Sequence, residues 1–555
     1  MTNQSMPDFY YAHQGCYLAL PDIGFDSGDT PYVDLNVLER DAALLQQEIE
    51  GAAALGCKGF VHLMNTVDDF VAYQWLDHPD AARRETRAEA LSHVMRPLVE
   101  LAHKLGMSYH IQTYELLFDR EVAKRANRDN IRHLLEGKYR EFFDRTGADG
   151  LFVTPSEAHP RGTTIWSDLW GGKAGAAEMA ADFKEVIVQR LGKELVFRLW
   201  LMAETDQEWE ALRGQLPPGL PLCVKNTASD FWNRVPLNPA LRREAPGPLH
   251  VLFDVYGQYH GWGKLLYFDS LWDPALEVCA QSGATIQLWG SWAPPCIWPN
   301  DAPHDMTGPQ PQSWAGRCWD LGLWQEGHLG GQLSMRWLMN RARGASSDQA
   351  MAQAAAAFNL APAETEALQA ALPLVMDLWD EMHTLHRGRL VPLLHQWATI
   401  YQSPRCTWRE VLADGAREGI LADNRRMESG VNALRAAGRA VSDPALRRTW
   451  DLTVLYFETF RLSREAACRD PRFAGGTGVD GGLLEALRDC LRQWASFSPE
   501  NADWLITAPF STRFPTRKRW LRPETLAEYV EKLATGQTDP VPDQTAFAME
   551  TWNGR

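Results

Sequence analysis

The sequence predicts an α/β chain with a (β/α)8 barrel over residues 1–330, followed by an all-α domain over residues 331–555. The first observation is an alternation of short apolar runs with helical patterns that starts near the beginning of the chain. The second is a repeated helix stop, in which a Leu-Gly pair ends a helical pattern at Gly56, Gly106 and Gly192. The third is a later stretch in which helical patterns follow one another without strands. A chain of 555 residues is also too long for one hydrophobic core.

Each predicted strand is a short, mainly apolar run. The eight strands are expected at Tyr10–Ala19, Gly59–Met64, Ser108–Tyr114, Gly150–Val153, Leu195–Met202, Leu222–Lys225, His250–Tyr256 and Thr285–Trp289. Helices are expected between most of them, at Leu38–Leu55, Arg87–Leu105, Asn130–Arg145, Ala174–Leu191 and Pro274–Gln281. The α-domain is expected to contain helices at Gln332–Arg343, Ser347–Phe358, Pro362–Leu385, Ala416–Gly438, Pro444–Ala467, Gly482–Ser496 and Pro523–Thr535.

The composition limits the kind of partner. A formal net charge of -16 disfavours nucleic acid and anionic membrane surfaces. Nine cysteines, an odd number without a CxxC pair, are typical of reduced thiols in a cytoplasmic protein. No leader with an apolar centre and no run long enough to span a membrane is visible. The 23 tryptophans are unusual; most are expected in the core, although indole faces also stack well on sugar rings.

The candidate site lies at the C-terminal ends of the predicted strands, where barrel enzymes hold their catalytic groups. Glu157 follows the apolar run Gly150–Val153, just beyond Pro155. The other strand ends add acids, cations and aromatic faces, with Asn65, Glu115, Arg198, Lys225, Asp230, Asp254, Tyr256, Trp289 and Trp292 as the candidates. Glycoside hydrolysis needs one protonated acid and one opposing base or nucleophile, and this set contains both.

Other chemistries lack their motifs. Phosphoryl transfer would need a Gly-rich phosphate loop, and acyl transfer would need a GxSxG turn; the sequence has neither. His13, His62 and His110 lie on the first three predicted strands, but no HxH pair or HExxH helix accompanies them. We therefore expect no metal and no cofactor.

Five segments, in the same order, resemble those of the family 67 α-glucuronidases. They are Ser156-Glu157, Leu195-Val-Phe-Arg198, Lys225-Asn-Thr-Ala-Ser-Asp230-Phe231, Asp254-Val-Tyr-Gly-Gln258 and Gly331-Gln-Leu-Ser-Met-Arg-Trp337. The resemblance covers roughly Leu38 to Phe358. It implies an exo-acting hydrolase that releases a uronic acid, and a homodimer through the helical domain.

Roles for the residues follow from this resemblance. Glu157 is the expected general acid, and Asp230 and Asp254 are the expected pair that activates water in an inverting reaction. Arg198 and Lys225 are expected to bind the substrate carboxylate. Sugar hydroxyls are expected to contact Asn65, Glu115 and Tyr256, and Trp289 and Trp292 provide aromatic faces.

The sequence also departs from that family. Val153 stands where the family has a Lys that helps to hold the uronate, and Asp254 stands where it has Glu. The family's N-terminal β-domain is expected to be missing, because the barrel begins almost at Met1. The chain is therefore interpreted as a divergent relative.

Three alternatives stay open. Val153 favours a hydrolase of a neutral sugar if it marks a lost carboxylate pocket. A metal-dependent sugar isomerase or lyase uses the same kind of barrel. A non-catalytic sugar-binding protein would keep the tryptophans, although it would have no need of Glu157, Asp230 and Asp254.

Overall fold

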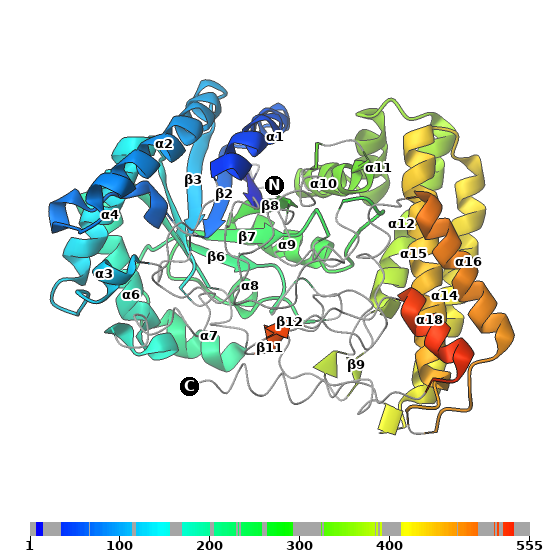
Figure 1. Ribbon diagram of the computed structural model, residues 1–555. Coiled ribbons are helices and arrows are strands. Elements are labelled where there is room, and N and C mark those ends of the chain that lie inside the picture. The colour runs from blue at the N-terminus through cyan, green and yellow to red at the C-terminus, as the bar shows by residue number, and fades with distance from the viewer. Residues whose placement is uncertain are drawn as a thin grey trace.

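The computed structural model describes most of both predicted domains. The described residues are 7–14, 35–65, 67–113, 118–155, 169–199, 205–228, 231, 235–257, 263–291, 323–324, 327–382, 385–386, 389–390, 412–413, 415–473, 475–497, 515–516, 519–520 and 526–537. They form a closed barrel of eight parallel strands in sequence order, with a set of helices after it (Figure 1). The predicted fold class is confirmed.

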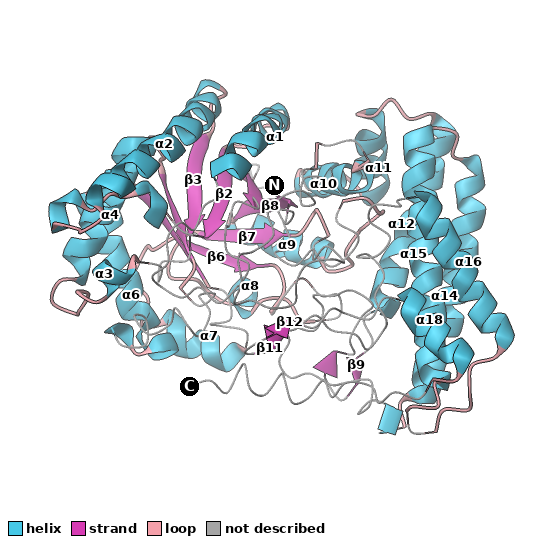
Figure 2. Ribbon diagram, viewed as in Figure 1, coloured by secondary structure: helices cyan, strands magenta, loops and turns pink. Residues whose placement is uncertain are grey.

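All eight predicted strands are present in the barrel. They are β1 (Phe9–Gln14), β2 (Gly59–Asn65), β3 (Ser108–Thr113), β4 (Gly150–Val153), β5 (Glu194–Arg198), β6 (Leu222–Lys225), β7 (Leu249–Phe253) and β8 (Thr285–Ser291). Two strands end earlier than predicted. Strand β5 stops at Arg198 although it was expected to reach Met202, and Leu199 is already outside it. Strand β7 stops at Phe253, not at Tyr256, because the Asp254 carboxylate accepts the N–H of Gly257 at 2.9 Å and turns the chain. Figure 2 shows the strands enclosed by helices.

The helices outside the barrel follow the strands in the expected alternation. They are α1 (Leu35–Ala54), α2 (Ala81–Lys104), α3 (Arg120–Ala123), α4 (Ile131–Thr146), α6 (Ala176–Phe183), continued by π-helical turns over Lys184–Arg190, α7 (Asp206–Arg213), α8 (Pro239–Arg242) and α9 (Trp272–Ser282). Gly56, Gly106 and Gly192 all adopt left-handed backbone, with φ of 80°, 78° and 65°. Glycine adopts this conformation without strain, so the predicted helix stops are confirmed.

The helical region packs around one long buried helix. Its helices are α10 (Leu329–Ala342), α11 (Ser347–Ala356), α12 (Pro362–Met382), α14 (Arg417–Ala437), α15 (Pro444–Arg469), α16 (Gly481–Phe497) and α18 (Leu526–Thr535). Helix α12 was expected to reach Leu385, but Leu385 lies in the short strand β9 (Leu385–His386), which pairs with β10 (Arg389–Leu390). Helix α15 is buried along most of its length. In Figure 1, α12, α14, α15 and α16 stand side by side, away from the barrel strands.

The chain after β7 joins the barrel to these helices. The N–H of Leu266 donates to Thr453 Oγ1 on α15 at 2.9 Å, and the carbonyl of Leu266 accepts from Trp379 Nε1 on α12 at 3.0 Å. Ser334 on α10 donates to the carbonyl of Tyr267. These contacts hold the segment Leu265–Phe268, which follows β7 in the chain, against the helical region.

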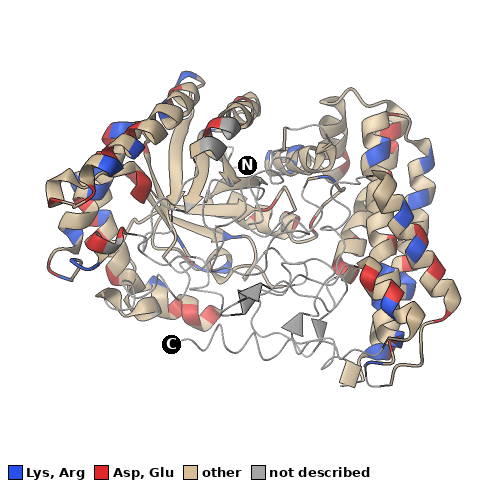
Figure 3. Cartoon of the chain, in the orientation of Figure 1, with Lys and Arg blue, Asp and Glu red and all other residues tan. Residues whose placement is uncertain are grey.

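The charged side chains lie mainly outside this core. Figure 3 shows Lys and Arg interleaved with Asp and Glu along the outer helices, while the barrel strands are largely uncharged. The five cysteines within the described residues are all buried and form no disulfide. None of the helices that the structure describes is long and apolar enough to cross a membrane.

Glu364 links the start of α12 to the start of α15. Its carboxylate accepts the N–H groups of Ala361 and Ser442 at 2.8 and 2.9 Å, and it also accepts from the N–H of Asp443. These backbone hydrogen bonds lower the pKa of Glu364 to about 2. Folding therefore stabilises the ionised form of the Glu364 side chain relative to its protonated form.

We expect Glu364→Gln to lower the thermal midpoint at pH 7, because the amide replaces a charged acceptor. The contribution of Glu364 is fully present above the ordinary Glu pKa of about 4.3 and is lost as the pH falls toward 2. Melting curves at several pH values should therefore show the variant and the native protein converging at low pH. Glu366→Gln, at an exposed site on the same helix, is the control and should leave the midpoint unchanged. A constant difference from pH 7 to pH 2 would contradict this origin.

Candidate active site

The strand register identifies which side chains face the barrel interior. Phe152 on β4 and His250 on β7 have ring centroids 5.4 Å apart although their strands are not neighbours, so both rings lie inside. Paired residues on parallel strands face the same side, and the side alternates along each strand. Gln112, which pairs with Phe152, therefore also faces inward.

The inward side chains form successive layers, each drawn from alternate strands, as is typical of eight-stranded barrels. From the N-terminal end upward, the register gives Tyr10, His110, Val196 and His250, then Val61, Phe152, Cys223 and Gln287, then Ala12, Gln112, Arg198 and Leu252, and finally Leu63, Thr154, Lys225 and Trp289. We call the last two sets the mouth layers. A bond within one layer supports the assignment, since Cys223 Sγ lies 3.2 Å from Gln287 Oε1 across the intervening strand β7.

An aromatic cluster closes the barrel beneath the mouth layers. The ring of Tyr10 lies 5.6 Å from that of His110 and 5.2 Å from that of His250, and Phe152 packs edge-on against both histidines. Burial lowers the pKa of His250 to about 4, so this imidazole is neutral at pH 7. This cluster therefore fills the barrel interior below the mouth layers.

Two cations from neighbouring strands are buried in the mouth layers. Arg198 on β5 is 3% exposed and Lys225 on β6 is 6% exposed. Both lie nearer the mouth than Cys223 on β6. Burial raises the pKa of the Cys223 thiol to about 12, and the nearby positive charges of Arg198 and Lys225 act to lower it. Charges in a water-poor site interact strongly with their surroundings, so two cations inside one barrel favour an anionic group at the mouth.

Aromatic faces lie beside both cations. The Arg198 guanidinium is 5.8 Å from the ring centroid of Trp289, which stands on the opposite wall, and its Nη1 is 3.5 Å from Thr154 Oγ1. Lys225 Nζ lies 4.5 Å from the ring centroid of Phe231. The rings of Phe231 and Trp289 are 6.4 Å apart. The mouth thus combines positive charge with flat apolar surface, a pairing suited to a charged sugar.

Asp254 provides a buried carboxylate at the same end of the barrel. It directly follows β7, continues the inward series of His250 and Leu252, and is 1% exposed. Its Oδ1 accepts the N–H of Gly257 at 2.9 Å, which fixes the carboxylate relative to the strand end. An oriented carboxylate at the same strand ends as two buried cations is suited to general base chemistry.

The remaining predicted site residues fall into three groups. Glu115, Glu157, Asp230 and Trp292 lie outside the described residues. Asn65 is the last residue of β2, but its side chain is also outside them. Tyr256 packs edge-on against His328, with ring centroids 5.9 Å apart, beside the start of α10. Its predicted contact with sugar hydroxyls stays a prediction.

The structure corrects the interpretation of Val153. On β4, Gly150 and Phe152 face inward, and Thr154 contacts Arg198, so Val153 points to the opposite side of the strand, among buried neighbours. The residue that borders the cations at this strand end is Thr154. Val153 therefore does not itself border the two cations, and the choice between a uronic and a neutral substrate stays a prediction.

Four residues at or near the mouth were missed in the sequence: Gln112, Thr154, Phe231 and Gln287. Because side chains alternate along a strand, the sequence places Gln112 on the same face of β3 as His110, and Gln287 on the same face of β8 as Trp289. Only the pairing with neighbouring strands shows that these two faces are the inner ones. Within the part of the chain that the structure describes, no three His, Cys, Asp or Glu side chains cluster as metal ligands.

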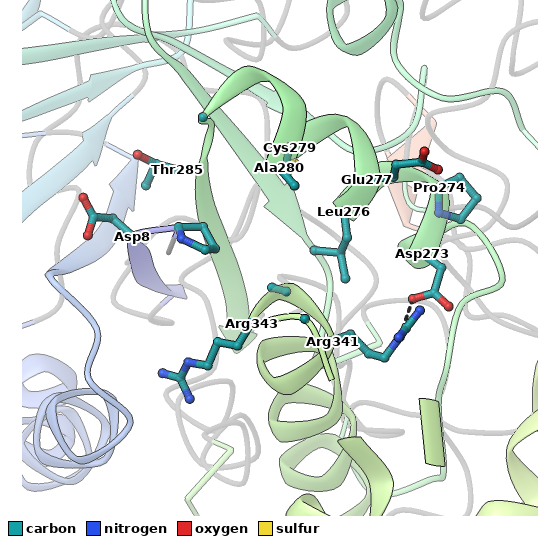
Figure 4. Close-up of a pocket in the computed structure, with 14 residues that line it drawn as sticks. Asp8, Asp273, Pro274, Leu276, Glu277, Cys279, Ala280, Thr285, Arg341 and Arg343 are labelled. Carbon is teal, nitrogen blue, oxygen red and sulfur yellow. Dashed lines mark hydrogen bonds and ion pairs between the residues drawn. The ribbon is translucent and has the colours of Figure 1, made fainter. Parts of the chain in front are cut away.

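A separate cavity of about 620 Å³ lies at the other end of the barrel. It is bordered by residues just before β1, by the start of β8, by α9 and by the end of α10 (Figure 4). Asp273 and Arg341 form an ion pair of 2.8 Å in its wall, and Asp8, Glu277 and Arg343 also line it. Because barrel enzymes act at the C-terminal ends of their strands, we assign the chemistry to the mouth.

Comparison with known proteins supports the architecture. No family model matches the chain, and no curated protein matches it either. A solved structure described as a GH138 enzyme targeting pectin rhamnogalacturonan II superposes with a TM-score of 0.51 at 11% identity, over 99% of this chain and 83% of that chain. A second, "Structure of CpGH84D", has 10% identity, covers 95% of this chain and 74% of that chain, and has a TM-score of 0.34, which carries no weight. The first likeness shows that this chain shares the fold of a known glycoside hydrolase.

Proposed function

We propose that this chain is an exo-acting glycoside hydrolase, similar to the α-glucuronidases, that releases a terminal uronic acid from an oligosaccharide. The observation that carries the proposal is the pair of cations, Arg198 and Lys225, buried on neighbouring strands in the barrel mouth.

The reaction needs an acid and a base on opposite faces of the sugar. In the proposal, Glu157 protonates the leaving oxygen, and Asp254 or Asp230 takes a proton from the attacking water. Asp254 is the described member of this set, held by the Gly257 N–H. An inverting enzyme keeps its carboxyl groups about 6.5–9.5 Å apart to admit the water. An α-linked substrate should then yield the β-anomer first.

The test uses a panel of uronic-acid-bearing and neutral oligosaccharides, incubated without added metal. Release of a uronic acid, with the β-anomer seen first by proton NMR, is the expected result. Release of a neutral sugar would overturn the carboxylate part of the proposal. Initial formation of the α-anomer would overturn the inverting part.

Arg198→Met and Lys225→Met should each lower kcat/KM selectively for uronic substrates. A hydrogen bond to a charged group contributes about 1.5–3 kcal/mol, so kcat/KM should fall about 10- to 150-fold for the uronic substrate. The comparison is with a neutral sugar of matched linkage, whose kcat/KM should change far less. Lys124→Met, at an exposed site that pairs only with Glu121 in the described structure, is the control. Equal losses on both substrates would contradict the carboxylate role.

A further inference from the structure

The barrel interior holds polar side-chain atoms that no described residue satisfies. Gln112 is fully buried, and neither its Oε1 nor its Nε2 has a hydrogen-bond partner among the residues that the structure describes. The same is true, within those residues, of Gln287 Nε2 and Trp289 Nε1. Buried polar groups in folded proteins are almost always hydrogen-bonded, so such a set points to a ligand or ordered water.

These atoms come from one side of the barrel and face the cations. Gln112 is on β3, and Gln287 and Trp289 are on β8, whereas Arg198 and Lys225 are on β5 and β6. Gln112 and Arg198 share a layer with Ala12, the smallest side chain in it. Gln287 lies one layer lower and is held through its Oε1 by Cys223. The two amides therefore lie on the side of the barrel interior opposite the cations, with Gln112 in the same layer as Arg198 and Gln287 one layer below it.

The set also has the hydrogen-bonding character of a sugar site. It presents three donors, Gln112 Nε2, Gln287 Nε2 and Trp289 Nε1, and one acceptor, Gln112 Oε1. Sugar hydroxyls both donate and accept, so a pyranose ring can satisfy all four atoms. A carboxylate can accept from the donors but cannot donate to Gln112 Oε1.

We infer that Gln112, with Gln287 and Trp289, forms the hydroxyl-recognition subsite for the terminal sugar, and that Gln112 is its specificity-determining residue. The sugar lies with its carboxylate toward β5 and β6 and its ring hydroxyls toward β3 and β8. The uronic identity of the sugar rests on the proposed function, whereas the position of the hydroxyl subsite does not.

The test is Gln112→Met, a change of nearly equal volume that removes both amide groups. In the absence of sugar, its thermal midpoint should equal or exceed that of the native protein, because a buried amide without a partner is removed. Binding of the free monosaccharide, measured by titration calorimetry, should weaken about ten- to hundredfold through the loss of two hydrogen bonds. A purely structural glutamine would show a lower midpoint instead.

Tyr139→Phe is the matched control. The Tyr139 hydroxyl is likewise buried without a hydrogen-bond partner in the described structure, but it lies on α4, outside the barrel. This variant should leave sugar binding unchanged. Trp289→Phe, which removes one donor and keeps an aromatic ring, is the second variant if Gln112→Met does not fold, and it should also weaken binding.

The sugars titrated are glucuronic acid, galacturonic acid, glucose and galactose. If the native protein binds a neutral sugar instead of a uronic acid, and Gln112→Met weakens that binding, the subsite holds and the proposed uronic substrate fails. If a uronic acid binds the native protein and Gln112→Met equally well, the subsite fails and the proposed function stands. Binding of none of the four sugars would overturn both.

Discussion

Glu157→Gln should lower kcat on a natural oligosaccharide by about two to four orders of magnitude, the usual contribution of a general acid. Glutamine keeps the size of the side chain but has no proton to transfer to the leaving oxygen. Glu157 lies outside the described residues, two positions after Pro155 in the sequence. Pro155 is the last described residue after β4, and it follows Thr154, which contacts Arg198. The measurement is steady-state kinetics on the substrate identified from the sugar panel.

The substrate itself supplies the control for this prediction. An aryl glycoside with a good leaving group needs little protonation, so the variant should retain most of its activity on that compound. Glu121→Gln, at a partly exposed position on α3, should leave kcat unchanged on both substrates. Nearly native kcat of Glu157→Gln on the natural oligosaccharide would remove Glu157 from the role of acid.

Arg84→Met should destabilise the barrel by about 3–5 kcal/mol, the usual cost of removing one member of a buried ion pair. Arg84 on α2 is 5% exposed and pairs with Asp68 at 2.8 Å and Asp119 at 3.1 Å. It also donates to the carbonyl oxygens of Asp68 and Val71. Burial alone would lower the pKa of Arg84, but Asp68, Tyr73 and Asp119 more than offset this and raise it above its ordinary value.

This arginine holds the segment that follows β2 at the mouth. Asp68 accepts from Tyr73 and lies 3.9 Å from Lys138 Nζ, and Asp119 is 2.7 Å from His78. Without Arg84, two buried carboxylates lose their main counter-charge. The change is measured as the shift in the urea midpoint of the barrel.

Arg83→Met is the matched control on the neighbouring residue. Arg83 is 72% exposed and pairs only with Asp80 in the described structure, and such surface pairs contribute about 0–1 kcal/mol. Similar midpoints for the two variants would show that the buried network does not stabilise the barrel.

Short apolar runs in the sequence made the strands of the barrel predictable. Runs such as Gly150–Val153 and Leu222–Lys225 were predicted with their observed bounds, because a strand buried on both faces is apolar throughout. Three short helices, α3, α7 and α8, were missed. Helix α7 has only eight residues and buries only Trp209, so its apolar pattern is too short to stand out, although Thr205 and Glu208 form a capping box that the sequence displays.

Strand ends were predicted less well where a side chain ends the strand. Asp254 was correctly placed at the end of the seventh strand, but the bond of its carboxylate to the Gly257 N–H stops β7 before Tyr256. Tyr256 then packs against His328 at the start of α10, a contact with the helical region that no local pattern indicates.

Local sequence patterns were enough to predict the alternation of strands and helices, the glycine stops and the presence of Arg198, Lys225 and Asp254 near strand ends. Which side of each strand faces the barrel interior became clear from the assembled barrel alone. Thr154 and Gln112 face the interior, whereas Val153 faces the opposite side of its strand. This orientation depends on pairing with other strands of the barrel. A shift of one residue in register moves every side chain of a strand to the opposite face, so no single segment contains this information.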